Sequence, residues 1–201
     1  MNKQKHFLNK LCTTGLITLF IGGSTVAFAD PNSAQQKMAN KITQVTNSDS
    51  KAKLDVEKDI YTHLVQTDHF TSAAAVAVTG YMGFESDFIP SVSITNDGNG
   101  LLQWTPNIYG KTPKTVDAQL QLLDNTMKNN STLLQQMTSE DDPMQAAKDF
   151  AISYMHVKDL ADNDFYFARL NSWVNKVHHD LTKANVIQPS QNNSNNNQGA
   201  Q

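Results

Sequence analysis

One glutamate of this chain stands in a setting that favours acid catalysis. Glu85 comes at the C-terminal end of a segment of small and apolar residues, 72–84, that we expect to be a helix. The partial negative charge of a helix C-terminus disfavours a second negative charge, and Phe84, Phe88 and Trp104 would shield the carboxylate from water. Both effects raise a carboxyl pKa, and a carboxylic acid that keeps its proton near neutral pH can protonate a glycosidic oxygen. For the isolated residue, the alternative is a solvated glutamate that ends a helix.

Other kinds of chemistry lack their residue patterns. The chain has no GxSxG segment, and Gly98-Asn99-Gly100 lacks the strand–turn–helix setting of a phosphate-binding loop. His178-His179-Asp180 is not the HExxH zinc pattern. His63 and His69 stand apart in the sequence, and we interpret them as surface residues. We therefore predict no metal site and no cofactor.

The N-terminus has the layout of a signal peptide. Lys3, Lys5 and Lys10 precede an apolar stretch over residues 11–26, and Ala27-Phe28-Ala29 forms the small-x-small pattern of a cleavage site. The apolar stretch is shorter than the roughly 20 residues that a bilayer-spanning helix needs. We predict a signal peptide over residues 1–29 and a secreted, extracellular protein with no membrane attachment after cleavage. An uncleaved N-terminal anchor is the alternative.

Cleavage would make the chain more acidic. It would remove three lysines and no acidic residue, so the formal net charge would change from −3 to −6. Arg169 is the single arginine, and an acidic chain without a basic cluster argues against nucleic-acid binding. Cys12, the single cysteine, lies in the predicted signal peptide, so the exported protein would hold no thiol or disulfide. We expect a monomer.

The rest of the chain is predicted to be one mainly α-helical domain with two polar flanks. We expect residues 30–51 to be an unstructured linker and residues 184–201 an unstructured Asn/Gln-rich tail, because neither has enough apolar residues to bury. Between them, the domain spans 52–183, and its apolar residues recur at helical spacing. Thr71 or Ser72 suits an N-cap, and Asp142-Pro143 is a cap followed by proline at the first helical position. From Phe88 to Lys114 the helical period stops, which predicts a short irregular or β-like insert lining a cleft.

Two motifs around Glu85 give a family resemblance. The first is the segment from Gly80 to Pro90, GYMGFESDFIP, and the second is GNGLLQW over residues 98–104. Together they resemble the phage tail lysozyme family, whose pattern is roughly GNM-x-x-ES-x-F-x-P followed by G-x-G-x-x-QW. More distantly the layout is similar to lytic transglycosylases and goose-type lysozymes. Downstream, VDAQL over residues 116–120 and the DP-x-x-AA-x-x-F-x-x-x-Y pattern ending at Tyr154 match the same family, and Arg169 follows where that family usually has an arginine.

The resemblance implies a lysozyme-like fold that acts on the glycan strands of peptidoglycan, in association with the cell wall. It places Glu85 at the catalytic acid. Gln103 would hydrogen-bond sugar or loop backbone, Trp104 would stack on a sugar ring, and Ser86 would orient the acid or cap the chain reversal. Tyr154 is carried over as a further substrate-binding residue. The chain departs from the pattern at Tyr81, where asparagine is usual, at Leu102, and at residues 155–157.

The sequence leaves the identity of a second catalytic group open. Inverting glycosidases place a second carboxylate about 6.5–9.5 Å from the acid, and retaining ones about 5–5.5 Å. Asp97 and Asp87 are the acidic residues nearest in sequence, and we take Asp97 as the candidate because it sits in the glycine loop, although Asp-Gly is also a common turn pair. A lytic transglycosylase would need no second carboxylate. The other readings are a non-catalytic peptidoglycan-binding module and a structural secreted domain.

Overall fold

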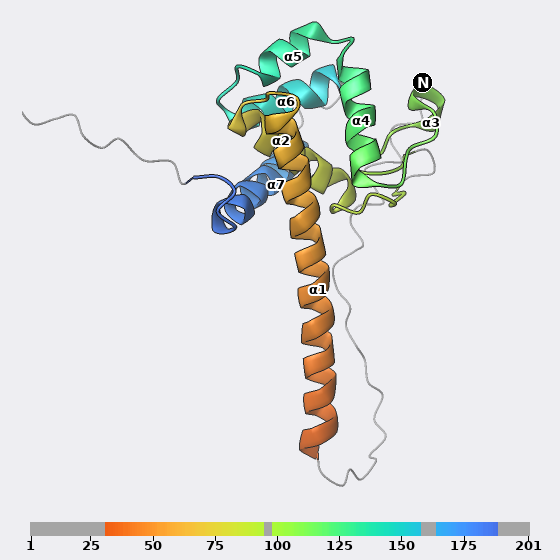
Figure 1. Ribbon diagram of the computed structural model, residues 1–201, viewed down its shortest axis with the longest axis vertical. Coiled ribbons are helices and arrows are strands. Elements are labelled where there is room, and N and C mark those ends of the chain that lie inside the picture. Colours follow the sequence, from red (N-terminus) through yellow and green to blue (C-terminus); the bar gives the residue numbers. More distant parts are fainter. Residues whose placement is uncertain (1–30, 95–97, 158–163, 189–201) are drawn as a thin grey trace, which may run out of the picture. The chain divides into compact units, whose positions relative to one another are not determined.

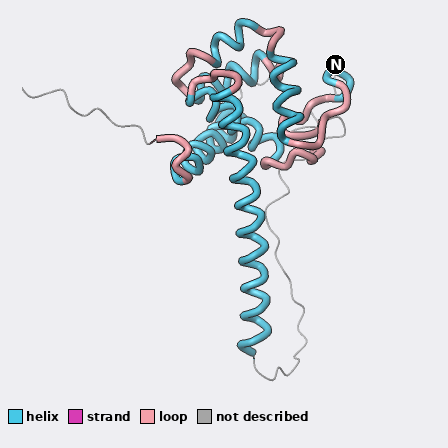
Figure 2. Tube along the Cα trace, viewed as in Figure 1, coloured by secondary structure: helices cyan, strands magenta, loops and turns pink. Residues whose placement is uncertain are grey.

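The computed structural model describes residues 31–94, 98–157 and 164–188, with side chains from Ser48 onward. All regular secondary structure in these residues is helical (Figures 1 and 2). The helices are α1 (Pro31–Gln66), α2 (Ser72–Ser86), α3 (Pro106–Tyr109), α4 (Val116–Met127), α5 (Ser131–Met137), α6 (Pro143–Ser153) and α7 (Asp164–Lys183). The predicted mainly helical, lysozyme-like fold class is confirmed.

The bounds of the folded part differ from those expected. The chain divides into two units, Met1–Ile42 and Thr43–Gln201. In the first unit the structure describes only the helical backbone of residues 31–42, and the predicted signal peptide lies outside the described residues. The expected unstructured linker over 30–51 was wrong for residues 31–51, which belong to α1. This segment is polar, but its Ala, Gln, Lys and Met residues are good helix formers, and helix propensity does not require a buried face.

The C-terminal bound of the domain also lies further along than predicted. Residues 184–188 are described, and Ile187 is buried, so they are part of the folded domain instead of the tail. The backbone N–H of Val186 donates to the carbonyl of Leu181 at 2.9 Å, which turns the chain back over the end of α7. Residues 189–201 lie outside the described part of the chain.

The second unit is built around α2, whose residues from Ala74 to Gly83 are all buried. This helix packs against α6 and α7 (Figure 1). A Cβ on Gly80 would lie 2.9 Å from the Cα of Val174 on α7, so the two helix backbones approach as closely as glycine allows. Gly80 thus faces another backbone, whereas Gly83 faces the aromatic side chains of Phe88 and Trp173.

The helix ends that the sequence indicated are present. Thr71 is the N-cap of α2, and its hydroxyl accepts from the backbone N–H of Ala74 at 3.0 Å. Asp142 caps α6 and accepts from the N–H groups of Met144 and Gln145 at 2.7 and 3.1 Å, with Pro143 at the first helical position. These caps satisfy amide groups that have no partner within the helix.

The insert between α2 and α4 is irregular, and no strand forms in its described residues. An isolated antiparallel bridge joins Asn99 and Trp104, and the short helix α3 follows. The buried side chain of Gln119 on α4 anchors the insert: its Oε1 accepts from the N–H of Leu101 at 2.7 Å, and its Nε2 donates to the carbonyls of Pro90 and Pro113. Gly100 has a φ of +78°, and a Cβ there would lie 2.5 Å from Gln119 Oε1. Glycine is therefore required at this turn.

None of the helices in the described residues combines the length and the apolar character needed to cross a bilayer.

Candidate active site

Glu85 lies in the last turn of α2, where the chain reverses sharply. Asp87 ends the helix in the left-handed conformation, with a φ of 52°, and its N–H donates to the carbonyl of Gly83 at 2.8 Å. Phe88 then folds back over the helix, and its ring meets Trp173 edge to face with centroids 5.9 Å apart. A Cβ on Gly83 would lie 2.7 Å from the Phe88 ring, so the glycine makes room for this reversal. The reversal holds the end of α2, and with it Glu85, in a defined position.

Glu85 is a half-buried residue, and its carboxyl group has a raised pKa. Burial raises the pKa of Glu85 to about 7, and a hydrogen bond from the Tyr81 hydroxyl acts in the opposite direction. The direction agrees with the expectation from the sequence. A carboxyl group with a pKa near 7 is protonated in a large fraction of molecules at neutral pH, which is the state that a general acid requires.

Two tyrosines surround the acid, and the sequence analysis did not assign them to the site. Tyr81 lies four residues before Glu85, one helical turn away on the same face of α2. Its hydroxyl bonds the Tyr166 hydroxyl of α7, and both rings are buried. Burial raises the pKa of Tyr81 well above its ordinary value and that of Tyr166 above its ordinary range, so both hydroxyls stay protonated as donors. The spacing of Tyr81 and Glu85 was the available signal, whereas Tyr166 is 85 residues away from Tyr81 and gave none.

The side chain of Gln103 forms hydrogen bonds within the insert between α2 and α4. Its Oε1 accepts from the N–H of Ile94 at 2.9 Å, and its Nε2 donates to the carbonyl of Gly100 at 2.8 Å. Gln103 itself has a φ of 49°. Of the two roles expected for this amide, the structure shows the hydrogen bonds to loop backbone.

Ser86 is buried, and its hydroxyl donates to the carbonyl of Met82 at 2.6 Å. Of the two roles expected for Ser86, orienting the acid or capping the chain reversal, the contact with the acid is not seen, because this side chain faces the interior and bonds a carbonyl in the last turn of its own helix. A serine in the last turn of a helix commonly bonds the carbonyl four residues back.

Trp104 and Tyr154 were expected to bind substrate, but both are buried. Trp104 is 1% exposed and Tyr154 is 5% exposed. The indole Nε1–H of Trp104 donates to the Tyr154 hydroxyl at 3.1 Å, and that hydroxyl also bonds the Thr126 hydroxyl at 2.6 Å. The ring of Trp104 is thus a core element beneath the insert and offers no face to a sugar. Asp97, the candidate second carboxylate, lies outside the described residues.

A second carboxylate with a raised pKa lies on α1. Glu57 is 1% exposed, and burial raises its pKa to about 7. Its Oε1 is buried and has no hydrogen-bond partner among the residues that the structure describes. It borders a cavity of about 350 Å³ whose lining includes Lys53, Asp87 and Lys176. The sequence analysis missed Glu57, because nothing in its neighbourhood along the chain distinguishes it from an exposed helical glutamate.

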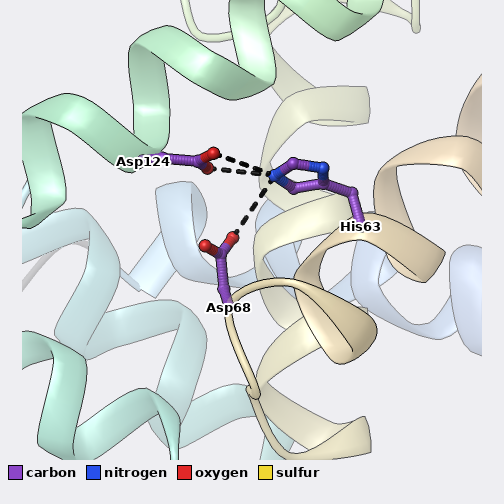
Figure 3. A group of neighbouring side chains, drawn as sticks. All are labelled: His63, Asp68 and Asp124. Carbon is purple, nitrogen blue, oxygen red and sulfur yellow. Dashed lines mark hydrogen bonds and ion pairs between the residues drawn. The ribbon is translucent and has the colours of Figure 1, made fainter.

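The histidine interpreted as a surface residue proved to be part of a cluster. His63 on α1 lies beside Asp124 on α4 and Asp68 in the loop between α1 and α2 (Figure 3). Among the described residues, these three side chains form a group whose nitrogen and oxygen atoms have the types and the spacing of metal ligands.

A helical domain whose buried central helix ends in a protonatable glutamate, followed by a glycine-rich insert, has the layout of a lysozyme-like protein. The family model for phage tail lysozymes matches residues 55–165, more than half of the 201 residues. The chain belongs to the phage tail lysozyme family. The matched region includes Glu85, Gln103 and Tyr154, and it ends at the start of α7. The comparisons with curated proteins and with solved structures found no match.

Proposed function

We propose that this protein cleaves the β-1,4 bond between N-acetylmuramic acid and N-acetylglucosamine in peptidoglycan, with Glu85 as the general acid. Membership of the phage tail lysozyme family supports a lysozyme-like, peptidoglycan-degrading function. The observation that carries the assignment of the acid is the position of Glu85, a half-buried residue at the end of α2 whose carboxyl group has a pKa of about 7.

A general acid must hold a proton before the bond breaks and must be stabilised as a carboxylate afterwards, and the surroundings of Glu85 favour both states. In the protonated state the carboxyl group donates its proton to the leaving glycosidic oxygen as the bond to the anomeric carbon breaks. The carboxylate that remains accepts the hydrogen bond of the Tyr81 hydroxyl, which favours the charged form. Burial therefore keeps a large fraction of Glu85 protonated at neutral pH. The hydrogen bond from Tyr81 lowers the free energy of the carboxylate that forms when the proton is transferred.

For the second step we favour hydrolysis, in which water attacks the anomeric carbon. Asp97 stays the candidate for the group that activates water or stabilises positive charge, on the ground of its place in the glycine loop. Lytic transglycosylation is the alternative: the 6-hydroxyl of the muramyl sugar attacks, and Glu85, having acted as acid, takes up the hydroxyl proton.

The setting of this activity is proposed from the sequence. The N-terminal layout supports export and a secreted, wall-associated enzyme, and the acidic composition is unfavourable for nucleic-acid binding. Glycan strands of the wall would be the substrate, and the enzyme would act as a monomer.

A muropeptide digest tests the proposal. Purified cell walls are treated with the unmutated protein, with Glu85→Gln and with Asp87→Asn, and the products are identified by mass spectrometry. Asp87 is a matched control, because it lies two residues from Glu85, is exposed and pairs with Lys53 at 2.6 Å, and asparagine tolerates its left-handed conformation. We expect products ending in reducing sugars from the unmutated protein and from Asp87→Asn, and none from Glu85→Gln.

Other results would redirect the assignment. Products ending in anhydro sugars, one water lighter, would identify a lytic transglycosylase that uses the same acid. Equal cleavage by Glu85→Gln would remove Glu85 from the mechanism. Wall binding by all three proteins without any product would leave a non-catalytic binding module.

A further inference from the structure

Three side chains from separate parts of the fold converge on one ring nitrogen. The Nε2 atom of His63 lies 3.0 and 3.2 Å from the two carboxylate oxygens of Asp124. Asp68 Oδ2 lies 3.8 Å from the same nitrogen (Figure 3). Both carboxylates, one from α4 and the other from the loop after α1, face the same edge of the ring. All three side chains are largely buried, with exposed fractions of 22% for His63, 14% for Asp68 and 18% for Asp124.

The donor atoms have the chemistry and the spacing of a zinc-type site. Zinc is bound by imidazole nitrogen and carboxylate oxygen at about 2.0–2.2 Å, and a tetrahedral arrangement at that radius separates neighbouring donor atoms by roughly 3.3–3.6 Å. One donor atom from each of the three side chains lies within 4.8 Å of the others. Only small side-chain movements would bring them around one ion, and water would complete the coordination.

A second observation indicates that this cluster is incomplete without a cation. Asp68 Oδ2 is closed off from solvent and has no hydrogen-bond partner among the described residues. A buried oxygen acceptor without a partner is costly, and two carboxylates that face each other repel. The nearby Asp124 charge contributes, after burial, to the raised pKa of Asp68. His63 carries at most one positive charge against two negative ones, so a divalent ion matches the charge of the carboxylates.

We propose that His63, Asp68 and Asp124 bind one divalent cation of the zinc class. The imidazole would bind through Nε2, and the proton that Nε2 donates to Asp124 in the metal-free form would pass to solvent. The two carboxylates would each supply one oxygen. The site joins the end of α1 and the loop after it to α4, and α4 carries Gln119, which anchors the glycine-rich insert. Its role is structural, and it does not depend on catalysis by Glu85.

Metal titration of the full-length protein tests this site. The metal-stripped protein is titrated with zinc chloride by calorimetry, and its melting temperature is measured with and without zinc. We expect one zinc ion per chain and a higher melting temperature with zinc, because an ion that binds only the folded state stabilises it. Asp124→Asn keeps the size and hydrogen-bonding capacity of the side chain, and we expect it to weaken binding at least tenfold, in line with the loss from disturbing metal-site partners.

A matched control separates this site from surface histidines. His178 and His179 are exposed neighbours on α7, and the double variant His178→Gln/His179→Gln removes this adjacent pair of surface histidines while it leaves His63 in place. Zinc binding should persist in this variant and be lost in His63→Gln. The opposite pattern, or a complete lack of heat and of thermal stabilisation in the unmutated protein, would overturn the proposal.

A spectroscopic measurement on the unmutated protein tests the site even if a variant fails to fold. Cobalt(II) replaces zinc in such sites, and tetrahedral coordination gives it strong visible absorption. We expect these bands in the unmutated protein and their loss when zinc is added. A weak octahedral spectrum, or a spectrum that Asp124→Asn leaves unchanged, would contradict the assigned ligands.

Discussion

Glu85 and Glu57 are two carboxyl groups whose pKa burial raises to about 7, yet their surroundings differ. Glu85 is partly exposed and receives a hydrogen bond from Tyr81. Glu57 is closed off, and its Oε1 has no hydrogen-bond partner in the described part of the chain. Lys176, on α7, is the positive charge that most opposes the raised pKa of Glu57.

The difference shows that a raised pKa alone does not identify a catalytic acid. A general acid must reach its substrate and must also be stabilised once it has lost its proton. Glu85 is half-buried, and its carboxylate accepts a hydrogen bond from Tyr81. Glu57 is 1% exposed, and its Oε1 has no hydrogen-bond partner among the described residues that would stabilise a carboxylate.

The largest expected effect is on wall cleavage. Glu85→Gln should reduce the cleavage rate by about 10²–10⁴-fold, the usual contribution of general acid catalysis, because glutamine has no proton to donate. Glu57→Gln should keep the rate within about twofold, since a group that substrate does not reach contributes little to the barrier. Initial rates of turbidity loss in a wall suspension measure both. A comparable loss in Glu57→Gln would show that the comparison between the two sites is wrong.

The next effect is on stability and its pH dependence. The pKa of Glu57 is raised from its ordinary value of 4.5 to about 7 in the folded state, so the folded state binds more protons than the unfolded state between these two pH values. The free energy of unfolding therefore falls as the pH rises through that window. Glu57→Gln stays neutral and should increase the free energy of unfolding at pH 8 by about 1–2 kcal/mol, below the full linkage value because solvent reaches the adjoining cavity.

Urea unfolding at pH 5 and at pH 8 checks this prediction. The variant should be more stable than the unmutated protein at pH 8, and the gain should shrink at pH 5. Lys176 and Lys58 oppose the shift, and Asp180 reinforces it, so measurements at equal salt concentration are needed. An equal gain at both pH values would show that packing, and not titration, causes the effect.

A smaller effect concerns the pH profile of activity. Tyr81→Phe removes the hydrogen bond that lowers the pKa of Glu85, so the high-pH limb of the rate profile should move to higher pH, while the rate at neutral pH changes by a few-fold. Tyr154→Phe is the control, because its hydroxyl bonds Trp104 and Thr126 in the core. It should lower stability by about 1–2 kcal/mol and leave the profile in place. If the pH profile of activity shifted in Tyr154→Phe and not in Tyr81→Phe, Tyr154 would belong to the active site.

The smallest effect is expected at Lys176. This side chain is half exposed and forms an ion pair with Asp180 at 2.6 Å, and such surface pairs contribute about 0.2–1 kcal/mol. Lys176→Gln should therefore lower the melting temperature only slightly and leave wall cleavage unchanged. A large loss of stability would mean that the lysine compensates Glu57 more strongly than its exposure indicates.

Much of the fold could be predicted because the signals are local. A hydroxyl or carboxylate before a helix satisfies backbone N–H groups within three residues, so Thr71 and Asp142 were readable as caps. The apolar stripe of α7, which includes Leu170, Val174 and Val177, has helical spacing and is buried as expected. The polar start of α1 was missed because its helix-forming residues bury no face that the pattern could reveal.

The site was predicted less well, because a residue type does not tell which face of the fold it joins. Trp104 carries a family motif that suggests stacking on sugar, but its ring is in the core. The Ser86 hydroxyl was also expected beside the acid, but it bonds a carbonyl of its own helix. Gln103 was predicted with two possible partners, sugar or backbone, and only the structure shows the backbone bonds.

By itself, the sequence determined the helical class, the family, and the place of Glu85 at the end of a buried helix, because these depend on spacings of a few residues and on motifs. Only the tertiary structure brought Tyr166 to Tyr81, and His63 to Asp68 and Asp124. His63 and Asp124 are 61 residues apart along the chain. Their distance in space follows from how α1 and α4 pack, and packing depends on the shape of the whole core, which no local pattern records.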